Sequence, residues 1–402
     1  MRRPRLRVVP PGAGMLAAEP EAPFIVHVAG ERELLQAVTS ALGLGVDLRQ
    51  EDEAVVAASR RDLERLATAL EVEGAEAGRR LRAFLWPVRG WRLRTRVLPL
   101  ERAVVMGILN LTDDSFSGDG VGRDVAAALR AAESLRAAGA DLIDVGAESA
   151  RADRPVLEPA QEAEIVARAV EALVREGHAV SSDTYKPEVA RAALAAGAEL
   201  VNDISGLTLG TRAAAEAARA GAGYVLNYSY SVPKRRPDSP PVYEDVVTET
   251  VAWMEERLEM LWEAGLEREQ VAIDPGIAFG KSHDEDLQMI RRIGELGTFG
   301  MPLLLAHSRK NFIGSVGGLP PAERDLETHV VSALAFAQGV RIFRVHDVAG
   351  ARRALEMAAA VAAREAGAFA PGEGSWPWRA GASAAHMTRA EPAIAPPPGQ
   401  RW

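Results

Sequence analysis

Short apolar runs alternate with stretches whose apolar residues recur every three or four positions, and this alternation organises most of the chain. Eight runs have the continuity of buried parallel strands, at 104–109, 141–145, 179–183, 200–203, 223–227, 271–274, 302–306 and 341–345. Helical periodicity follows them at about 123–138, 158–176, 187–196, 211–220, 243–265, 284–296, 323–338 and 349–366. Eight strand–helix pairs predict a fold of the α/β class, a (β/α)8 TIM barrel. The alternative, a doubly wound open sheet, would more often carry a Gly-rich phosphate turn after its first strand, and none follows residue 109.

The segments on either side of the barrel have different patterns. Residues 1–21 are rich in Pro and Gly and are expected to be disordered. Residues 22–90 predict a small α/β extension of unknown role, with strands at 24–28 and 54–58 and helices at 31–42, 61–70 and 76–85. The barrel domain is expected over 91–368, and its first ten residues alternate in the way typical of a hairpin. Residues 369–402, rich in Ala, Pro and Gly, predict a disordered tail.

Composition narrows the classes of function. The net charge is −9, from 47 Lys and Arg against 56 Asp and Glu, which argues against general binding to nucleic acid or to membrane surfaces. The chain has no cysteine, so disulfides, thiolate metal sites and cysteine nucleophiles are excluded. Neither a signal peptide nor a run of about 18 apolar residues is visible, and a cytoplasmic protein is expected.

Polar side chains stand at the predicted end of almost every barrel strand, where TIM barrels carry their chemistry. Taken in chain order they are Asn110; Asp144, Glu148 and Arg151; Asp183 and Lys186; Asn202 and Asp203; Asn227; Asp274 and Lys281; His307, Arg309 and Lys310; and Arg344, His346 and Asp347. Any one of them could be an ordinary turn or cap residue. Their recurrence at successive strand ends predicts one shared site.

The residue types indicate a substrate that carries negative charge and hydrogen-bonding edges. Segments Ser308–Gly314 and Arg344–Asp347 place three cations and an imidazole at the last two strand ends, the usual phosphate-binding part of such barrels. Asn110 is a neutral oxygen ligand of the kind that Mg²⁺ accepts beside substrate phosphates. The loop Asp274–Lys281 combines a carboxylate, an aromatic ring and an amine, which suits a planar heterocycle.

Other catalytic classes have weaker support. No Ser-His-Asp order and no HExxH motif is visible, so nucleophilic hydrolysis and zinc proteolysis are not favoured. His307 and His346 are too far apart in sequence to argue a metal pair from spacing. Both are interpreted as polar loop residues, with His346 the better candidate for contact with a ligand.

Six segments resemble, in the same order, the motif series of the dihydropteroate synthase family: MGILNLTDDSFSGDG, GADLIDVGAESARAD, SSDTYKPEVARAALAAGAELVNDISG, IDPGIAFGK, HSRKNFIG and RVHD. The resemblance covers about residues 91–368, and the extension looks like one carried by some longer members. It implies a transferase that condenses 6-hydroxymethyl-7,8-dihydropterin diphosphate with p-aminobenzoate, giving 7,8-dihydropteroate and pyrophosphate. It also implies Mg²⁺ as cofactor and a homodimer formed through roughly residues 323–366.

The resemblance further implies roles for individual residues. The pterin ring would be held by Asp183, Asn202, Asp274 and Lys310, of which Asp183, Asp274 and Lys310 would be catalytic. The diphosphate would be bound by Asn110, Arg151, Arg344 and His346, and Mg²⁺ by Asn110. The p-aminobenzoate site would be bordered by Phe279, Ser308 and Lys310. The implied mechanism is dissociative: pyrophosphate departs, a pterin-stabilised cation forms, and the aniline nitrogen attacks it.

The chain departs from the usual family pattern at several positions. Asp113 replaces a Pro, Ala150 a Thr, Ala152–Asp153 a Pro-Gly pair, Asn227–Tyr228 a Met-His pair, and Ala278 a Gly. These changes leave two alternatives open, a pterin-binding paralogue without synthase activity and a pterin-dependent methyltransferase on the related barrel. The cations of the last two loops favour a diphosphate substrate over the methyltransferase.

Overall fold

The central feature of the fold is a closed sheet of eight parallel strands. The computed structural model describes residues 6–10, 24–29, 32–49, 53–112, 120, 122–148, 156–235, 239 and 241–362. The barrel strands are β7 (Val104–Asn110), β8 (Leu142–Gly146), β9 (Val180–Asp183), β10 (Leu200–Asp203), β11 (Gly223–Asn227), β12 (Val271–Asp274), β13 (Leu304–Leu305) and β14 (Ile342–Val345). They are hydrogen-bonded in the order β12-β11-β10-β9-β8-β7-β14-β13, and a parallel bridge between Ile273 and Leu303 closes the ring. The predicted (β/α)8 barrel is confirmed.

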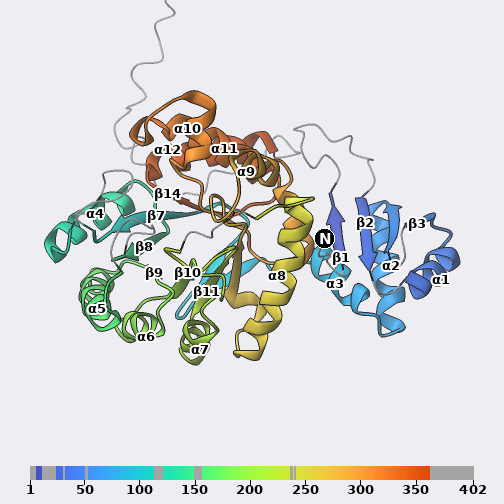
Figure 1. Ribbon diagram of the computed structural model, residues 1–402, viewed down its shortest axis with the longest axis horizontal. Helices are drawn as coiled ribbons and strands as arrows, with labels where there is room; N and C mark the ends of the chain where they lie inside the picture. The colour runs from blue at the N-terminus through green and yellow to red at the C-terminus, as the bar shows by residue number, and fades with distance from the viewer. Residues whose placement is uncertain are drawn as a thin grey trace, which may run out of the picture. The chain divides into compact units, whose positions relative to one another are not determined.

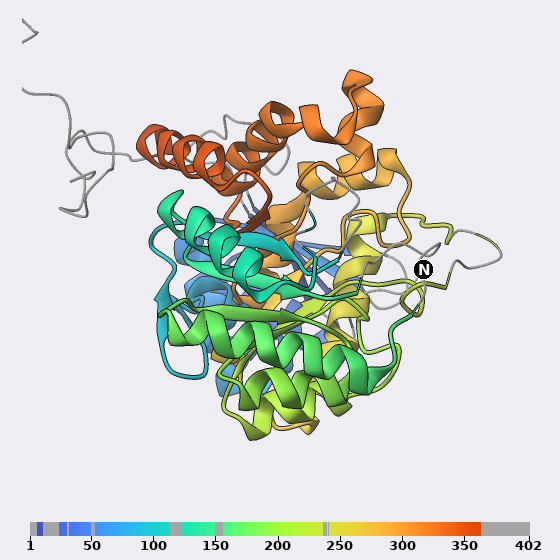
Figure 2. The same ribbon diagram turned by 90° about the vertical axis from the view of Figure 1, so that its left-hand side faces the viewer.

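The barrel strands are followed by helices, which lie outside the sheet (Figures 1 and 2). They are α4 (Val125–Ala137), α5 (Pro159–Arg175), α6 (Pro187–Ala195), α7 (Arg212–Arg219), α8 (Val246–Glu263), α9 (His283–Arg291), α11 (Asp325–Ala337) and α12 (Val348–Ala362). Local sequence sets several of their starts. Asp124 caps α4 by accepting bonds from two backbone N–H groups, a Ser282–Glu285 capping box opens α9, and Pro occupies the first turn of α5 and α6.

The amino-terminal end of the barrel is closed by apolar side chains. A hairpin of β5 (Gly90–Arg92) and β6 (Val97–Pro99) supplies Trp91, which is fully buried among inward-facing residues of the barrel strands. The indole Nε1 donates to the carbonyl oxygen of Gln270 at 2.9 Å. Because this end is filled, the polar chemistry of the barrel is left to the opposite end, where the strands terminate.

The extension folds as an antiparallel sheet covered by helices. Its strands are β1 (Leu6–Val9), β2 (Phe24–Ala29), β3 (Val46–Arg49) and β4 (Glu53–Ala58), in the order β1-β2-β4-β3. Its helices are α1 (Arg32–Leu42), α2 (Arg60–Val72) and α3 (Glu76–Leu85), and they share an apolar core with the sheet. The strands and helices predicted between residues 24 and 85 are present, and β3 was not predicted.

The expectation of disorder over residues 1–21 is wrong for Leu6–Val9, which forms strand β1. Leu6 and Val8 are fully buried, and the Val8 N–H donates to Thr298 Oγ1 at 2.7 Å. Arg7 forms an ion pair with Glu295 at 2.7 Å. These partners lie 288 and 290 residues away in the sequence, so a local composition rich in Pro and Gly could not reveal them. The tail expected at 369–402 lies outside the described residues.

Two barrel elements also differ from their predictions. The strand expected at 302–306 is reduced to Leu304–Leu305 with a bridge at Leu303. The helix expected at 284–296 ends at Arg291 and continues as the 3-10 helix η2 (Ile293–Phe299), where Gly294 and Gly297 have low helix propensity. The structure adds α10 (Asn311–Gly317), η1 (Arg268–Gln270) and η3 (Pro321–Glu323). Within the described segments, no helix has the length and apolarity that crossing a membrane requires.

Removal of the Trp91 side chain should destabilise the barrel. Trp91→Ala is expected to lower the free energy of unfolding by about 3–5 kcal/mol, since it leaves a cavity and an unpaired Gln270 carbonyl. Trp91→Phe should cost less because it keeps most of the apolar volume. Urea unfolding followed by circular dichroism measures both variants, and an unchanged midpoint for Trp91→Ala would contradict this account of the closed end.

Candidate active site

The carboxyl ends of four barrel strands meet around one guanidinium group. Arg344 on β14 places Nε 2.5 Å from Asp144 Oδ2 on β8, and Nη2 2.8 Å from Asp183 Oδ2 on β9. Asp144 is fully buried and also accepts bonds from Ser181 Oγ at 2.5 Å and from Asn202 Nδ2 at 3.0 Å. The predicted site residues Asp183, Asn202 and Arg344 are therefore brought together, although Arg344 lies 161 residues from Asp183 in the sequence.

The carboxyl group of Asp183 is a weaker acid than an ordinary aspartate side chain. Burial raises its pKa to about 7, and the nearby Asp144 carboxylate acts in the same direction. Arg344 acts against the shift, but its positive charge is shared between the two carboxylates. Asp183 therefore changes its charge near neutral pH, in the range where catalytic and binding groups are often poised.

A second group of predicted residues lies on the loops that follow β12 and β13. Asp274 is buried, accepts a bond from the Gly276 N–H at 2.7 Å, and has its pKa raised by burial. Lys310 Nζ donates to the Ile277 carbonyl oxygen at 2.6 Å and lies 4.8 Å from the centroid of the Phe279 ring. Burial lowers the pKa of Lys310 to about 8. An amine, a carboxylate and an aromatic face are thus available to one planar ligand.

Two of the family departures form part of this arrangement. The Tyr228 ring carries Lys281 Nζ on its face, 3.5 Å from the centroid, and its hydroxyl lies 2.7 Å from that of Tyr243. Lys281 also donates to the Pro275 carbonyl oxygen at 2.9 Å, and burial lowers its pKa to about 7. Ala278 adopts a φ of 65°, a conformation that favours Gly, while its N–H donates to Asp286 Oδ1 at 2.9 Å. Sequence reasoning missed Tyr243 and Asp286, which no motif marks.

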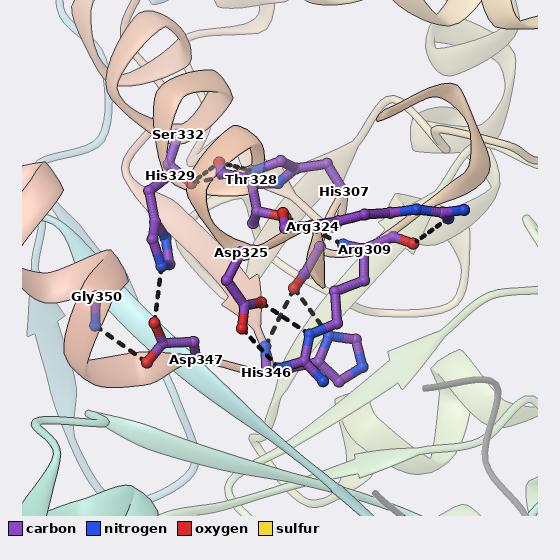
Figure 3. Close-up of polar contacts among 11 residues, drawn as sticks. His307, Arg309, Arg324, Asp325, Thr328, His329, Ser332, His346, Asp347 and Gly350 are labelled. Carbon is purple, nitrogen blue, oxygen red and sulfur yellow. Dashed lines mark hydrogen bonds and ion pairs between the residues drawn. The ribbon is translucent and has the colours of Figure 1, made fainter. Parts of the chain in front are cut away.

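The two histidines have different environments. His346 lies at the site (Figure 3), and its Nδ1 is 2.8 Å from Ser308 Oγ. A residue predicted to bind diphosphate therefore contacts one predicted to border p-aminobenzoate. His307 is fully buried, with Nε2 2.9 Å from the Thr328 carbonyl oxygen and 3.0 Å from Ser332 Oγ. Burial lowers its pKa to about 4, so this residue of the loop after β13 is neutral and packed into the interior.

Other strand-end residues form pairs beside this centre. Lys186 Nζ contacts Glu148 at 2.7 Å and Glu162 at 2.5 Å, and the Tyr185 hydroxyl donates to Glu148 at 2.6 Å. Asp203 is buried and accepts a bond from the Tyr224 hydroxyl at 2.6 Å. The ion pairs of Lys186 link the loops after β8 and β9 to α5, and the Tyr224–Asp203 bond joins β11 to the end of β10. Nothing in the sequence singled out Glu162, Tyr185 or Tyr224.

Asn110 ends β7 and is half-buried. Among the described residues, no three His, Asp or Glu side chains form a group that could hold a metal ion. A single amide oxygen therefore fits Mg²⁺ only where substrate phosphates and water supply the remaining ligands, which is a common arrangement for this ion. Arg151 and the departures Asp113, Ala150 and Ala152–Asp153 lie outside the described residues.

Comparison with known proteins identifies the family. The profile of the family described as pterin binding enzyme matches residues 106–346. The chain belongs to the family of pterin-binding enzymes. The match runs from β7 to His346 and so contains nearly all of the strand-end residues described above. Residues before 106, including the whole extension, lie outside it.

Relatives of this pterin-binding enzyme are similar over most of their own length. Dihydropteroate synthase of Mycobacterium leprae (strain TN) is 37% identical over 269 residues, which are 65% of this chain and 95% of the relative. A crystal structure of dihydropteroate synthase from Yersinia pestis with a sulfonamide drug superposes with a TM-score of 0.64 at 34% identity, covering 68% of this chain and 98% of that one. The enzyme from Thermus thermophilus in complex with 4-aminobenzoate has a TM-score of 0.61 at 38% identity, covering 68% and 100%.

The shifted pKa of Asp183 predicts that pterin binding depends on pH. An ionised carboxylate accepts hydrogen bonds from pterin N–H groups, so affinity should rise as pH increases from 6 to 8, with a midpoint near 7. Calorimetric titration with 6-hydroxymethylpterin measures the profile. The Asp183→Asn variant, whose side chain cannot ionise, should bind the pterin more weakly, and its affinity should not rise between pH 6 and 8. A variant profile identical to that of the parent would contradict the assignment.

Proposed function

We infer that the chain catalyses the dihydropteroate synthase reaction, in which 6-hydroxymethyl-7,8-dihydropterin diphosphate and p-aminobenzoate give 7,8-dihydropteroate and pyrophosphate. The observation that carries this proposal is the polar centre at the carboxyl end of the barrel, where Asp183, Asn202 and Arg344 share one hydrogen-bond network around the buried Asp144. The relatives named above are dihydropteroate synthases, and one of their structures holds 4-aminobenzoate.

The pterin ring is assigned to the carboxylates of Asp183 and Asp274 and to their neighbours. Asp183 and Asp274 present acceptors to the donor edges of the ring, while Asn202 and Lys310 present donors. Asp274 and Asn202 are 2% and 4% exposed, so their interactions with the ring act in a medium of low polarity. This arrangement fixes the orientation of the ring.

The diphosphate is assigned to the residues at the rim of the same centre. Two nitrogen atoms of Arg344 bind Asp144 and Asp183, and Nη1 is the one that the described residues leave for a diphosphate oxygen. His346 stands beside it, oriented by the hydroxyl of Ser308. Asn110, and Arg151 by its place in the motif, complete this proposed set. Asn110 would hold Mg²⁺, which when bound neutralises negative charge on the diphosphate.

The chemistry then follows from the placement of charge. The C–O bond between the pterin methylene and the diphosphate breaks, and pyrophosphate leaves with the electron pair. The positive charge that develops on the pterin is stabilised by the ionised Asp183 and Asp274 carboxylates beneath it. The aniline nitrogen of p-aminobenzoate, positioned along Phe279, Ser308 and Lys310, forms the new C–N bond and loses a proton. Pre-organised charge thus acts mainly on the transition state.

Synthase activity can be measured directly. Purified protein with both substrates and Mg²⁺ is expected to release pyrophosphate and 7,8-dihydropteroate in equal amounts, and omission of Mg²⁺ should abolish turnover. Asp183→Asn and Lys310→Ala should each lower kcat/KM at least about 100-fold, since each removes an ionisable group from the centre. Val72→Ala, an exposed residue of α2, serves as the control. Pterin binding without product would instead identify the chain as a paralogue lacking synthase activity.

We also propose that the enzyme is a homodimer formed through its last two helices. On α11, Leu326, Val330 and Leu334 recur at helical spacing on one face and are 71%, 53% and 36% exposed. On α12, Met357 and Val361 are 66% and 78% exposed. An apolar face of this kind is unfavourable in water and suits a self-complementary contact with a second copy. The cytoplasmic location predicted from the sequence stays a prediction.

The dimer proposal predicts a change of mass. Val330→Glu places a charge in the centre of the apolar face and should shift the protein from dimer to monomer in sedimentation velocity experiments. Val72→Glu introduces the same charge at an exposed site of the extension and should leave the mass unchanged. A parent protein that sediments as a monomer would overturn the proposal.

A further inference from the structure

The segment that carries two proposed site residues contains an unfavourable backbone conformation. Arg309 has a φ of 59°, in the left-handed region that non-glycine residues rarely adopt. It stands between Ser308, which contacts His346, and Lys310, which contacts the Ile277 carbonyl. Backbone strain at such a position persists only when surrounding contacts enforce it.

The first turns of α11 supply those contacts. The guanidinium of Arg309 binds both carboxylate oxygens of Asp325, each at 2.8 Å. The Arg309 N–H donates to Thr328 Oγ1 at 3.2 Å, and its carbonyl oxygen accepts from Arg324 Nη1 at 2.9 Å. Figure 3 shows Asp325, Thr328 and Arg324 around Arg309. The donor, the acceptor and the side chain of this one residue are therefore all engaged by a single helix end.

The residues on either side of Arg309 are held by the same region. His307, which precedes Ser308, is 2.9 Å from the Thr328 carbonyl and 3.0 Å from Ser332 Oγ. Arg324 Nη1 also reaches the Lys310 carbonyl oxygen at 3.3 Å. Arg324 itself is buried against Gly314, where an added Cβ atom would clash with Nη2. A side chain at position 314 would thus displace the guanidinium.

We propose that Arg324, Asp325 and Thr328 form a clamp that sets the conformation of Arg309 and thereby the positions of Ser308 and Lys310. These three residues position the p-aminobenzoate side of the site. Arg309 acts through its backbone conformation, which the ion pair between its guanidinium and Asp325 helps to hold. This inference rests on the roles proposed for Ser308 and Lys310. If φ at residue 309 were negative, the chain would leave Ser308 in another direction, and the contacts to His346 and Ile277 would not both form.

Two substitutions of Arg309 distinguish the effect of its backbone conformation from the effect of its side chain. Arg309→Ala and Arg309→Gly both remove the guanidinium, but only Gly adopts a positive φ without strain. Steady-state kinetics should show Arg309→Ala roughly tenfold below Arg309→Gly in kcat/KM, mainly through a higher KM for p-aminobenzoate. Equal losses in the two variants, or no loss in either, would overturn the clamp. Glu323→Ala, at a neighbouring exposed carboxylate, should match the parent.

A double-mutant cycle tests Asp325. In the parent, Asp325→Ala should raise the KM for p-aminobenzoate about fivefold. In the Arg309→Gly background it should have little further effect, because the guanidinium that Asp325 binds is already absent. An equally large effect of Asp325→Ala in both backgrounds would contradict the assigned route. Thermal unfolding of each variant shows whether the fold is retained.

A readout that does not need turnover keeps this inference separate from the proposed function. The imidazole NMR resonances of His346 report its contact with Ser308. They should stay parental in Arg309→Gly and shift in Arg309→Ala, even if the parent makes no 7,8-dihydropteroate. Identical His346 resonances in the parent and both variants would refute the clamp, whereas inactivity of the parent with the expected shifts would refute only the synthase assignment.

Discussion

The site depends on two carboxylates, the buried Asp144 and the half-buried Asp183, that share one guanidinium. Burial of Asp144 and Asp183 is costly, and Arg344 alone compensates it only in part, so Ser181 and Asn202 contribute further hydrogen bonds to Asp144. These partners come from β8, β9, β10 and β14. The closure of the barrel, which pairs β14 with β7, is therefore the same event that assembles the polar centre.

The two ends of the barrel differ in character: the amino-terminal end is packed with apolar side chains, and the carboxyl end carries the polar side chains. At the amino-terminal end, Trp91 and the inward-facing strand residues pack as an apolar cluster that fills the interior. At the other end, side chains that differ widely in sequence position converge. The loops there are held by ion pairs such as Lys186–Glu148 and by the aromatic contact of Lys281 with Tyr228, so the centre is supported from its rim. Rigid support of this kind is what charge-based catalysis requires.

Two departures from the family pattern are accommodated by local packing. Tyr228 takes part in a contact network with Lys281 and Tyr243, and the strained Ala278 is held by Asp286. Their effect is to fix the loop that carries Phe279 and the Ile277 carbonyl. The positive φ of Arg309 in the next loop is enforced in a comparable way by α11. At both loops, contacts from neighbouring helices and loops stabilise the strained backbone conformations.

The sequence by itself determined the barrel and the strand ends that carry its chemistry. Buried parallel strands and their helices leave periodic apolar patterns, and polar residues at their ends are visible without knowledge of contacts. The sequence could not determine how those ends pair. Arg344 contacts Asp183 across 161 residues, His307 turns into the core, and β1 finds Thr298 across 290 residues. Burial, shared charge and the conformation of Arg309 arise only when distant segments meet, so the tertiary structure alone decided them.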